Sequence, residues 1–250
     1  MIFWIAAGTA AFLLGLSKGG IPVVAVLAVP LLSTMMDPAM AAGLLLPLYL
    51  TADVYAVYLF RRAFSIRNLR ILLPSAVIGV LGGFFAVSYV SSDALKLLLS
   101  VIGFWYLANS LRARFSNQAV LAKPAHVGKG VFWGSLAGLT SYIAHAGAPP
   151  YQAYVLPQRL EKMVYLGTTT IFFTCVNLMK LPAFILAGQV TWAGLSLAVW
   201  IAPVALLGAW SGAKISRWLP EQVFFILVEV ALGLLSFMLL YDALQGLGLV

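Results

Sequence analysis

The sequence predicts an all-α polytopic membrane protein made of two inverted structural repeats, each with a broken helix hairpin plus three transmembrane helices. Of the 250 residues, 63% are hydrophobic and 9% are charged, and the mean hydropathy is +1.02. A soluble domain would need more polar surface than this composition supplies. Several continuous apolar runs approach or exceed the ~20 residues that a helix needs to cross a bilayer, and they lack the alternation of a membrane β-barrel.

The charged residues also favour a membrane protein. The formal net charge is +8, but Lys and Arg lie in the connectors between apolar runs, as they do in cytoplasmic loops. No basic stripe carries interleaved aromatic residues, so nucleic acid is not expected as a partner. Cys175 is the single cysteine, and no zinc motif is present, so we expect no disulfide within the chain, no metal site and no cofactor. The amino terminus has no basic n-region and no A-x-A site, and we therefore expect no removable signal peptide.

The first repeat is expected at residues 1–111 and begins with a broken segment. Its two apolar pieces, 2–16 and 23–33, are each too short to span a ~30 Å core at 1.5 Å per residue. The run Ser17-Lys18-Gly19-Gly20-Ile21-Pro22 lies between them and combines a charge with two glycines and a proline, which weaken a helix. Three full spans are expected next, at about 39–60, 71–90 and 94–111.

The second repeat, residues 130–250, follows a polar cytoplasmic connector at residues 112–129 and has a similar plan. Its broken segment covers about 130–156 and is interrupted by the run His145-Ala146-Gly147-Ala148-Pro149. Three spans are expected after it, at about 163–185, 192–216 and 221–241.

The two breaks align residue for residue. Four pairs are each 127 residues apart: Lys18 with His145, Gly20 with Gly147, Pro22 with Pro149, and Pro30 with Pro157. A second set, 129 residues apart, aligns Pro74, Gly79 and Gly83 with Pro203, Gly208 and Gly212. These glycines have the small-xxx-small spacing that lets helices approach closely. A weaker match at a spacing of 124 aligns Asp53 with Asn177 and Gly43 with Gly167. Internal duplication of this kind is common in transporters.

The distribution of positive charge predicts that the two repeats are inverted. Arg and Lys concentrate in the connectors at 61–70, 112–129, 159–162 and 214–217, which we assign to the cytoplasm. The other connectors and both termini are poor in positive charge. These assignments agree only if each broken segment enters and leaves on the same face, so that the first opens outward and the second inward. Both termini are then expected in the periplasm.

On these segments the chain resembles the sulfite exporter TauE/SafE family. The most specific parts are GLSKGGIPVVAVLAVPLL at residues 15–32 and HAGAPPYQAYVLPQRLEK at residues 145–162. The stretch YLGTTTIFFTCVNLMKLPAF at residues 165–184 also resembles the family pattern, with Gly167, Thr168, Asn177 and Lys180. The resemblance covers essentially the whole chain. It implies a multi-pass protein of the bacterial inner (plasma) membrane that moves sulfite, sulfonates or related organosulfur anions.

The two breaks are expected to form a site for a small anion in mid-membrane. Helices that start at Pro22 and Pro149 would direct free N–H groups and the positive ends of their dipoles at a sulfite or sulfonate oxygen. Glycines just upstream allow a close approach of the backbone. The expected substrate-binding residues are Lys18, Gly19, Gly20, His145, Gly147, Gln152 and Asn177.

Several polar residues have more than one interpretation. Asp53 and Glu229 lie near the centres of their spans, where a carboxylate is costly, and a coupling or gating role is expected for both. Asp53 could instead pair with Lys18, which we favour over proton coupling, and Glu229 could be a protonated or hydrogen-bonded packing residue. Lys18 could otherwise snorkel along its helix, and His145 could be satisfied by a carbonyl. Lys180 is expected to snorkel at the outer interface.

The sequence therefore predicts a secondary transporter, and more specifically an exporter, of a small sulfur-containing oxyanion by alternating access around the site between the two broken helices. No G-x-x-x-x-G-K-[ST] motif is present, so ATP-driven pumping would need a partner. The main alternative is an importer or ion-coupled transporter of another anion, such as a carboxylate or sulfate. An intramembrane enzyme and a channel or assembly factor are weaker alternatives, and we expect no enzymatic activity and no catalytic residues. The expected partners are the anion and the lipid bilayer; a coupling proton or cation, and the oligomeric state, are left open.

Overall fold

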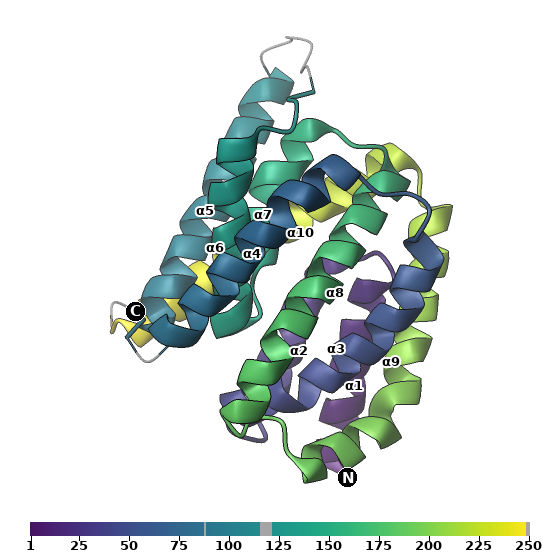
Figure 1. Cartoon of the computed structure of the whole chain (residues 1–250), viewed down its shortest axis with the longest axis vertical. Helices are drawn as coiled ribbons and strands as arrows, with labels where there is room; N and C mark the ends of the chain where they lie inside the picture. Colours follow the sequence, from purple (N-terminus) through teal and green to yellow (C-terminus); the bar gives the residue numbers. More distant parts are fainter. Residues whose placement is uncertain (88, 116–121, 249–250) are drawn as a thin grey trace. The chain divides into compact units, whose positions relative to one another are not determined.

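The computed structural model describes residues 1–87, 89–115 and 122–248, and all regular structure in these ranges is helical (Figure 1). The expected all-α fold is confirmed. Six of the described helices are long and apolar enough to cross a membrane: α3 (Pro38–Phe60), α4 (Ile66–Ala86), α5 (Ser92–Phe115), α8 (Lys162–Leu186), α9 (Trp192–Trp218) and α10 (Glu221–Gly246). They correspond to the six expected spans. Residues 116–121 of the expected connector lie outside the described residues.

Helix α4 begins earlier than the sequence predicts. The expected span runs from about 71 to 90, whereas the helix begins at Ile66 and ends at Ala86. Asn68, in the first turn, is buried and exchanges two side-chain hydrogen bonds with Gln158, of 2.9 and 3.1 Å. Because this partner is 90 positions away, the arginine-bearing turn is held in a helix by a contact that the local sequence does not reveal.

The helices form two compact units, each of which combines segments from both halves of the sequence. Unit 1 comprises Met1–Ser65 and Lys162–Phe224, and unit 2 comprises Ile66–Glu161 and the chain from Phe225 onward. The units therefore do not follow the expected division into residues 1–111 and 130–250. That division stays a prediction about internal duplication.

Both broken segments are present. The first, in unit 1, consists of α1 (Ile2–Lys18), a 3₁₀ helix (Pro22–Leu27) and α2 (Ala28–Ser33). The second, in unit 2, consists of α6 (Val127–Ala144), α7 (Ala148–Val155) and a 3₁₀ turn (Leu156–Gln158). The piece that begins at Pro22 is thus a 3₁₀ helix, whereas the one that begins at Ala148 is an α-helix.

Gly20 ends the first helix. Its φ is +121°, which glycine adopts without steric cost. The N–H of Ile21 donates to the carbonyl of Leu16 (3.3 Å) and the N–H of Gly20 donates to that of Ser17 (3.2 Å). These two bonds form a Schellman ending, which satisfies carbonyls left open at the helix terminus. The first break therefore lies at the glycine pair, as expected.

His145 has the corresponding role at the second break. Its φ is 52°, and it is the residue at which α6 ends. Histidine is among the non-glycine residues that tolerate this left-handed region. Gly147, which aligns with Gly20 in the sequence, has a φ of −74°. The alignment therefore predicts the location of the second break, but the left-handed residue lies two positions earlier.

Glycines allow long helices to pack closely in both units. In unit 1, α1 packs against α9, and a Cβ atom at Gly208 would collide with the backbone of Phe12. In unit 2, α4 lies beside α6 (Figure 1), and a Cβ atom at Gly79 would collide with the backbone of Ser135. The close approach expected from the small-xxx-small spacing is confirmed at these two glycines.

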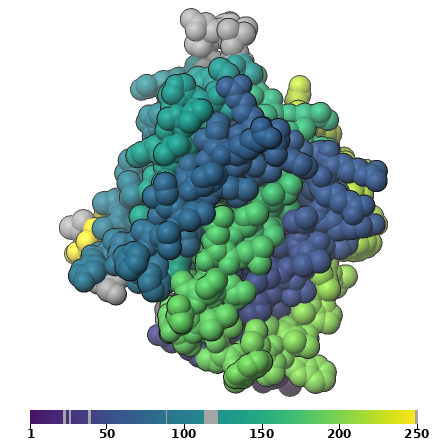
Figure 2. Space-filling model, in the orientation of Figure 1, coloured from purple at the N-terminus to yellow at the C-terminus, as the bar shows by residue number. Residues whose placement is uncertain are grey.

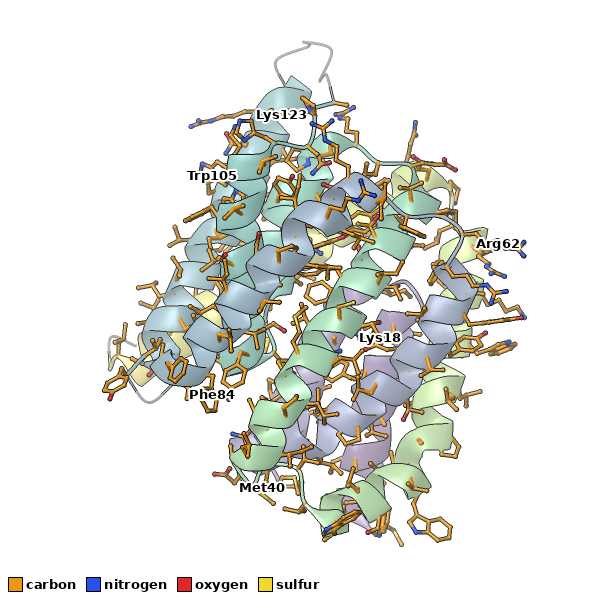
Figure 3. All side chains as sticks on the ribbon, in the orientation of Figure 1. Lys18, Met40, Arg62, Phe84, Trp105 and Lys123 are labelled. Atoms are coloured by element: carbon orange, nitrogen blue, oxygen red, sulfur yellow. The ribbon has the colours of Figure 1, made fainter. Side chains whose placement is uncertain are left out.

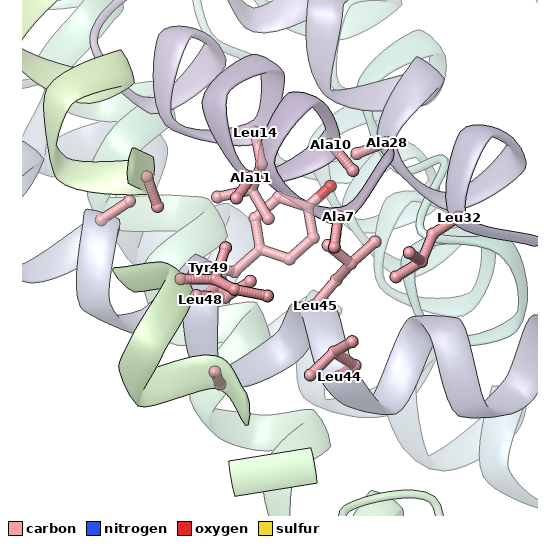
Figure 4. Packing of buried hydrophobic residues seen from close by; sticks show 14 of the residues in the cluster. Ala7, Ala10, Ala11, Leu14, Ala28, Leu32, Leu44, Leu45, Leu48 and Tyr49 are labelled. Atoms are coloured by element: carbon pink, nitrogen blue, oxygen red, sulfur yellow. The ribbon is translucent and has the colours of Figure 1, made fainter. Parts of the chain in front are cut away.

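The apolar core of unit 1 positions the middle of α3. Figure 4 shows Tyr49 of α3 among Ala11 and Leu14 of α1, and all three residues are buried. Helices α3 and α8 lie side by side (Figures 1 and 2). Asp53 is one turn after Tyr49 on α3, so the same packing places a carboxylate between α1 and α8.

Candidate functional site

Lys18 and Asp53 form a buried ion pair in unit 1. Lys18 is the last residue of α1, directly before the break (Figure 3), and its side chain is 9% exposed. Its Nζ lies 2.7 Å from Oδ1 of Asp53, whose side chain is fully buried. Nζ is also 5.2 Å from the centre of the Tyr49 ring, within cation–π range. Of the alternatives open for Lys18, pairing with Asp53 is the one observed, and the side chain does not snorkel to the surface.

Asn177 joins this pair from a third helix. Its Nδ2 donates to Oδ2 of Asp53 at 2.9 Å, and its side chain is buried on α8. One carboxylate oxygen therefore contacts an ammonium group and the other accepts from an amide. Asp53 and Asn177 are also the residues that align at a spacing of 124 in the sequence, and in the structure they are in direct contact.

Lys180 belongs to the same buried set, and the expectation that it snorkels at the outer interface is wrong. The residue is only 1% exposed, because α8 continues beyond it to Leu186 and its inner face packs on α3. It interacts electrostatically with both Lys18 and Asp53, and its Nζ is 6.0 Å from the Phe184 ring centre. The available signal was its three-residue distance from Asn177, which places both side chains on one helix face.

The buried ionisable groups of this set do not balance. Lys18 and Lys180 contribute two amines, whereas Asp53 is the one buried carboxylate among the described residues of unit 1. The other two acidic residues of the unit, Asp37 and Glu221, are exposed. Hydrogen bonds between either lysine and neutral groups do not change the total charge of the set. Two protonated lysines would therefore give the set a net charge of about +1, which is costly in a low-dielectric interior.

Gly19 and Gly20 stabilise the break through backbone hydrogen bonds and close packing. The hydroxyl of Ser216 on α9 donates to the carbonyl of Gly19 at 3.0 Å, and a Cβ atom at Gly19 would collide with the backbone of α9 near Ala209. The N–H groups of Gly19 and Gly20 donate to carbonyls of α1. At this break the Lys18 side chain is thus the group best suited to meet an anion.

The remaining expected substrate-binding residues lie in unit 2. His145 forms the end of α6, and Gly147 is the buried residue at which α7 begins. The carbonyl of Gly147 accepts from the N–H of Tyr151 at 3.3 Å. Gln152 is 2% exposed on α7. His145 and Gly147 thus lie at the second break and Gln152 follows it on α7, and their role in substrate binding stays a prediction.

Glu229 is held by hydrogen bonds between α5 and α10 in unit 2. Its Oε1 accepts from the hydroxyl of Ser110 at 2.8 Å and from that of Tyr106 at 3.3 Å. This geometry favours the hydrogen-bonded packing role over the expected coupling role. Sequence reasoning missed both hydroxyl donors, because nothing local links them to a residue 119 to 123 positions away.

One surface groove lies apart from these residues. It has a volume of about 670 Å³ and is lined by α3 and α9, including Tyr55, Leu59, Trp210, Lys214, Arg217 and Trp218. None of the expected site residues lines it. The buried charge cluster of unit 1 is thus a separate feature, formed by Lys18, Asp53, Asn177 and Lys180; we refer to it as the lysine–aspartate cluster.

Comparison with known proteins assigns the chain to a protein family. A family model described as sulfite exporter TauE/SafE matches residues 3–239. No curated protein and no solved structure matches the chain. Since the family match covers nearly the whole sequence, this chain belongs to the sulfite exporter TauE/SafE family of membrane transporters.

Proposed function

We propose that this protein is a secondary transporter that exports a small sulfur-containing oxyanion, such as sulfite or a sulfonate. Membership of the family and the six apolar helices support membrane transport of a sulfur compound. The observation that carries the choice of an anion is the lysine–aspartate cluster, in which two amines share one carboxylate. When both amines are protonated, a bound anion supplies the second negative charge that balances them.

Lys18 is the primary anion contact in this proposal. An ammonium group has three N–H donors, so its contact with one oxygen of Asp53 leaves donors for a second oxyanion. A charge-assisted hydrogen bond of this kind contributes about 1.5–3 kcal/mol. Lys18 lies at the end of α1, next to an irregular stretch of backbone. At membrane depth such backbone is tolerated where it is buried in protein or lines a water-filled cavity. This position is therefore suited to a cavity that binds a ligand.

Asp53 acts as the internal counter-ion of the empty site. Its 2.7 Å contact with Lys18 neutralises the amine when no substrate is bound. The hydrogen bond from Asn177 holds the other oxygen and keeps the carboxylate oriented. A substrate anion then competes with Asp53 for Lys18, so that binding and release exchange one ion pair for another.

The second broken segment is included in the proposed site because its sequence aligns with that of the first break. His145, Gly147 and Gln152 would contribute further donors to the same midplane site, which alternating access exposes to each side in turn. Cysteines replacing Ile21 and Ala148 in a chain with Cys175→Ser test this directly. Cross-linking of the two cysteines supports a shared site. If they do not cross-link either with or without substrate, the shared site is contradicted.

Transport itself is tested with purified protein in liposomes. Sulfite and isethionate (2-hydroxyethanesulfonate), a monoanionic sulfonate, are loaded inside, and their exit is measured together with saturable counterflow. A transporter moves the anion chemically unchanged and shows counterflow, whereas an enzyme alters it and a channel lacks counterflow. Faster exchange of sulfate or a carboxylate than of sulfite and isethionate would overturn the proposed substrate class.

A further inference from the structure

We infer that one proton accompanies each anion and that Lys180 is the residue that carries it. This inference rests on the proposed anion transport and deepens it by naming the coupled ion. The starting observation is that Lys180 is almost fully buried in the interior of unit 1, on the same face of α8 as Asn177, which contacts Asp53.

Three helices carry the ionisable groups that interact with Lys180, Lys18 or Asp53. α1 contributes Lys18, α3 contributes Asp53 and Tyr49, and α8 contributes Cys175. α2 carries no ionisable side chain, and the cations of α9, Lys214 and Arg217, are exposed. Among the described residues of unit 1, Asp53 is therefore the buried group that can balance an ammonium.

The two lysines are not equivalent toward this carboxylate. Lys18 lies 2.7 Å from Oδ1 of Asp53 and forms a direct ion pair with it. The other carboxylate oxygen of Asp53 accepts from Asn177. Lys180 interacts electrostatically with the same carboxylate and with Lys18. Protonation of Lys180 therefore adds a second positive charge, whereas Asp53 balances only one. Lys180 is thus the member of the cluster whose charge state can change at the least cost.

The charge balance of the cluster couples anion binding to protonation of Lys180. In the empty site Lys180 is neutral, and Lys18 and Asp53 balance each other. When a monoanion binds, a proton from water on the loading side forms an N–H bond with the Nζ lone pair of Lys180, and the loaded site is neutral again. On the far side the N–H bond breaks, the proton returns to water and the anion leaves. The cycle moves one proton with each monoanion and no net charge.

This scheme also selects among anions. A monoanion such as a sulfonate or hydrogensulfite is balanced by one proton at Lys180, whereas a dianion such as sulfate leaves an excess negative charge in the interior. Buried unbalanced charge is unfavourable. The substrate class therefore narrows to monoanions.

The test measures proton uptake on binding by the wild-type protein. Isethionate is added to purified protein in weakly buffered detergent solution at pH 7 to 8 with a pH-indicator dye, and binding is quantified in parallel by calorimetry. Because isethionate does not titrate in this range, we expect uptake of about one proton per anion bound, and an affinity that falls up to tenfold per pH unit as the pH rises. Binding without proton uptake would overturn the inference and leave the proposed transport intact. Absence of binding by any sulfur anion would instead remove the proposed transport, and the inference with it.

Two substitutions locate the proton. Lys180→Arg keeps a positive charge that cannot titrate, so it should bind isethionate without proton uptake and with little dependence on pH. Lys180→Gln should bind weakly at every pH. Lys214→Gln, which removes an exposed lysine of the same unit, serves as the matched control and should keep the proton uptake. Undiminished proton uptake by folded Lys180→Arg would place the proton elsewhere and overturn the assignment; if neither Lys180 variant folds, the wild-type measurement decides.

Discussion

Asp53 and Asn177, which are 124 residues apart in the chain, meet through a 2.9 Å hydrogen bond inside unit 1. The amide binds one carboxylate oxygen while Lys18 contacts the other at 2.7 Å. A single buried carboxylate therefore connects α1, α3 and α8. This connection makes Asp53 both a structural element of unit 1 and the group with which a substrate anion would compete.

Asp53→Asn should strongly destabilise the protein. The change removes the one buried carboxylate of unit 1 and leaves two amines without it, and breaking a buried ion pair in this way costs about 3–5 kcal/mol. Thermal unfolding in detergent should show a clear loss of Tm. Asp37→Asn is the control, since Asp37 is exposed and its Oδ1 accepts from the N–H of Met40, which an asparagine can also do. Equal stability of the two variants would show that the ion pair contributes little.

Lys18→Ala should weaken anion binding more than it reduces the amount of folded protein. Loss of a charge-assisted hydrogen bond predicts a decrease in affinity of roughly 10- to 100-fold. Binding of isethionate, normalised to folded protein, measures the effect, and Lys18→Gln provides a variant that can still donate to Asp53. Lys96→Ala is the matched control, because Lys96 forms a partly exposed pair with Asp93. Unchanged transport by Lys18→Ala would remove this residue from the site.

Much of the fold follows from composition and local sequence. Continuous apolar runs define the six spans, and the glycine pair at Gly19 and Gly20 marks the end of α1, because a Schellman ending needs a residue with positive φ. The ion pair of Lys18 and Asp53 was one of the alternatives that the cost of an intramembrane carboxylate suggests. Each of these features depends on residues close in sequence or on a simple charge rule.

The features that the sequence did not reveal depend on tertiary contacts. Lys180 lies near the end of its span in the sequence, like an interfacial lysine, and the packing of α8 on α3 buries it. The early start of α4 depends on the bond between Asn68 and Gln158. His145, rather than Gly147, takes the left-handed conformation, because alignment of the two breaks fixes their location and not the dihedral angles within them.

Gly15→Ala should destabilise α1 packing. A Cβ atom at this position would fall on the backbone carbonyl of Ala205 in α9, and overpacking against backbone costs about 1–3 kcal/mol. Gly8→Ala is the matched control on the same helix, because no atom lies within 4 Å of a Cβ atom there. Alanine favours a helix over glycine by roughly 0.5–1 kcal/mol, so this control should be neutral or stabilising. A similar Tm for both variants would argue against close packing of α1 and α9.

Reporter fusions test the expected topology. If the two repeats are inverted and each broken segment enters and leaves on one face, both chain termini lie in the periplasm. Alkaline phosphatase fused to either terminus should then be active, and a fluorescent protein that matures only in the cytoplasm should stay dark. The reverse result at the carboxyl terminus alone would mean that one broken segment crosses the membrane, and it would break the inverted arrangement.

Glu229→Gln should leave transport within about twofold of the wild type, since its role is to accept hydrogen bonds from Ser110 and Tyr106, and an amide oxygen can do the same. Glu229→Leu, by contrast, leaves both hydroxyls without this acceptor. Loss of the acceptor costs about 1–3 kcal/mol for a buried group such as the Tyr106 hydroxyl, so the Tm should fall. Comparing anion transport and Tm for the two variants separates packing from coupling. A Glu229→Gln protein that folds normally but no longer moves protons with the anion would restore the coupling role expected from the sequence and would contradict Lys180 as the proton carrier.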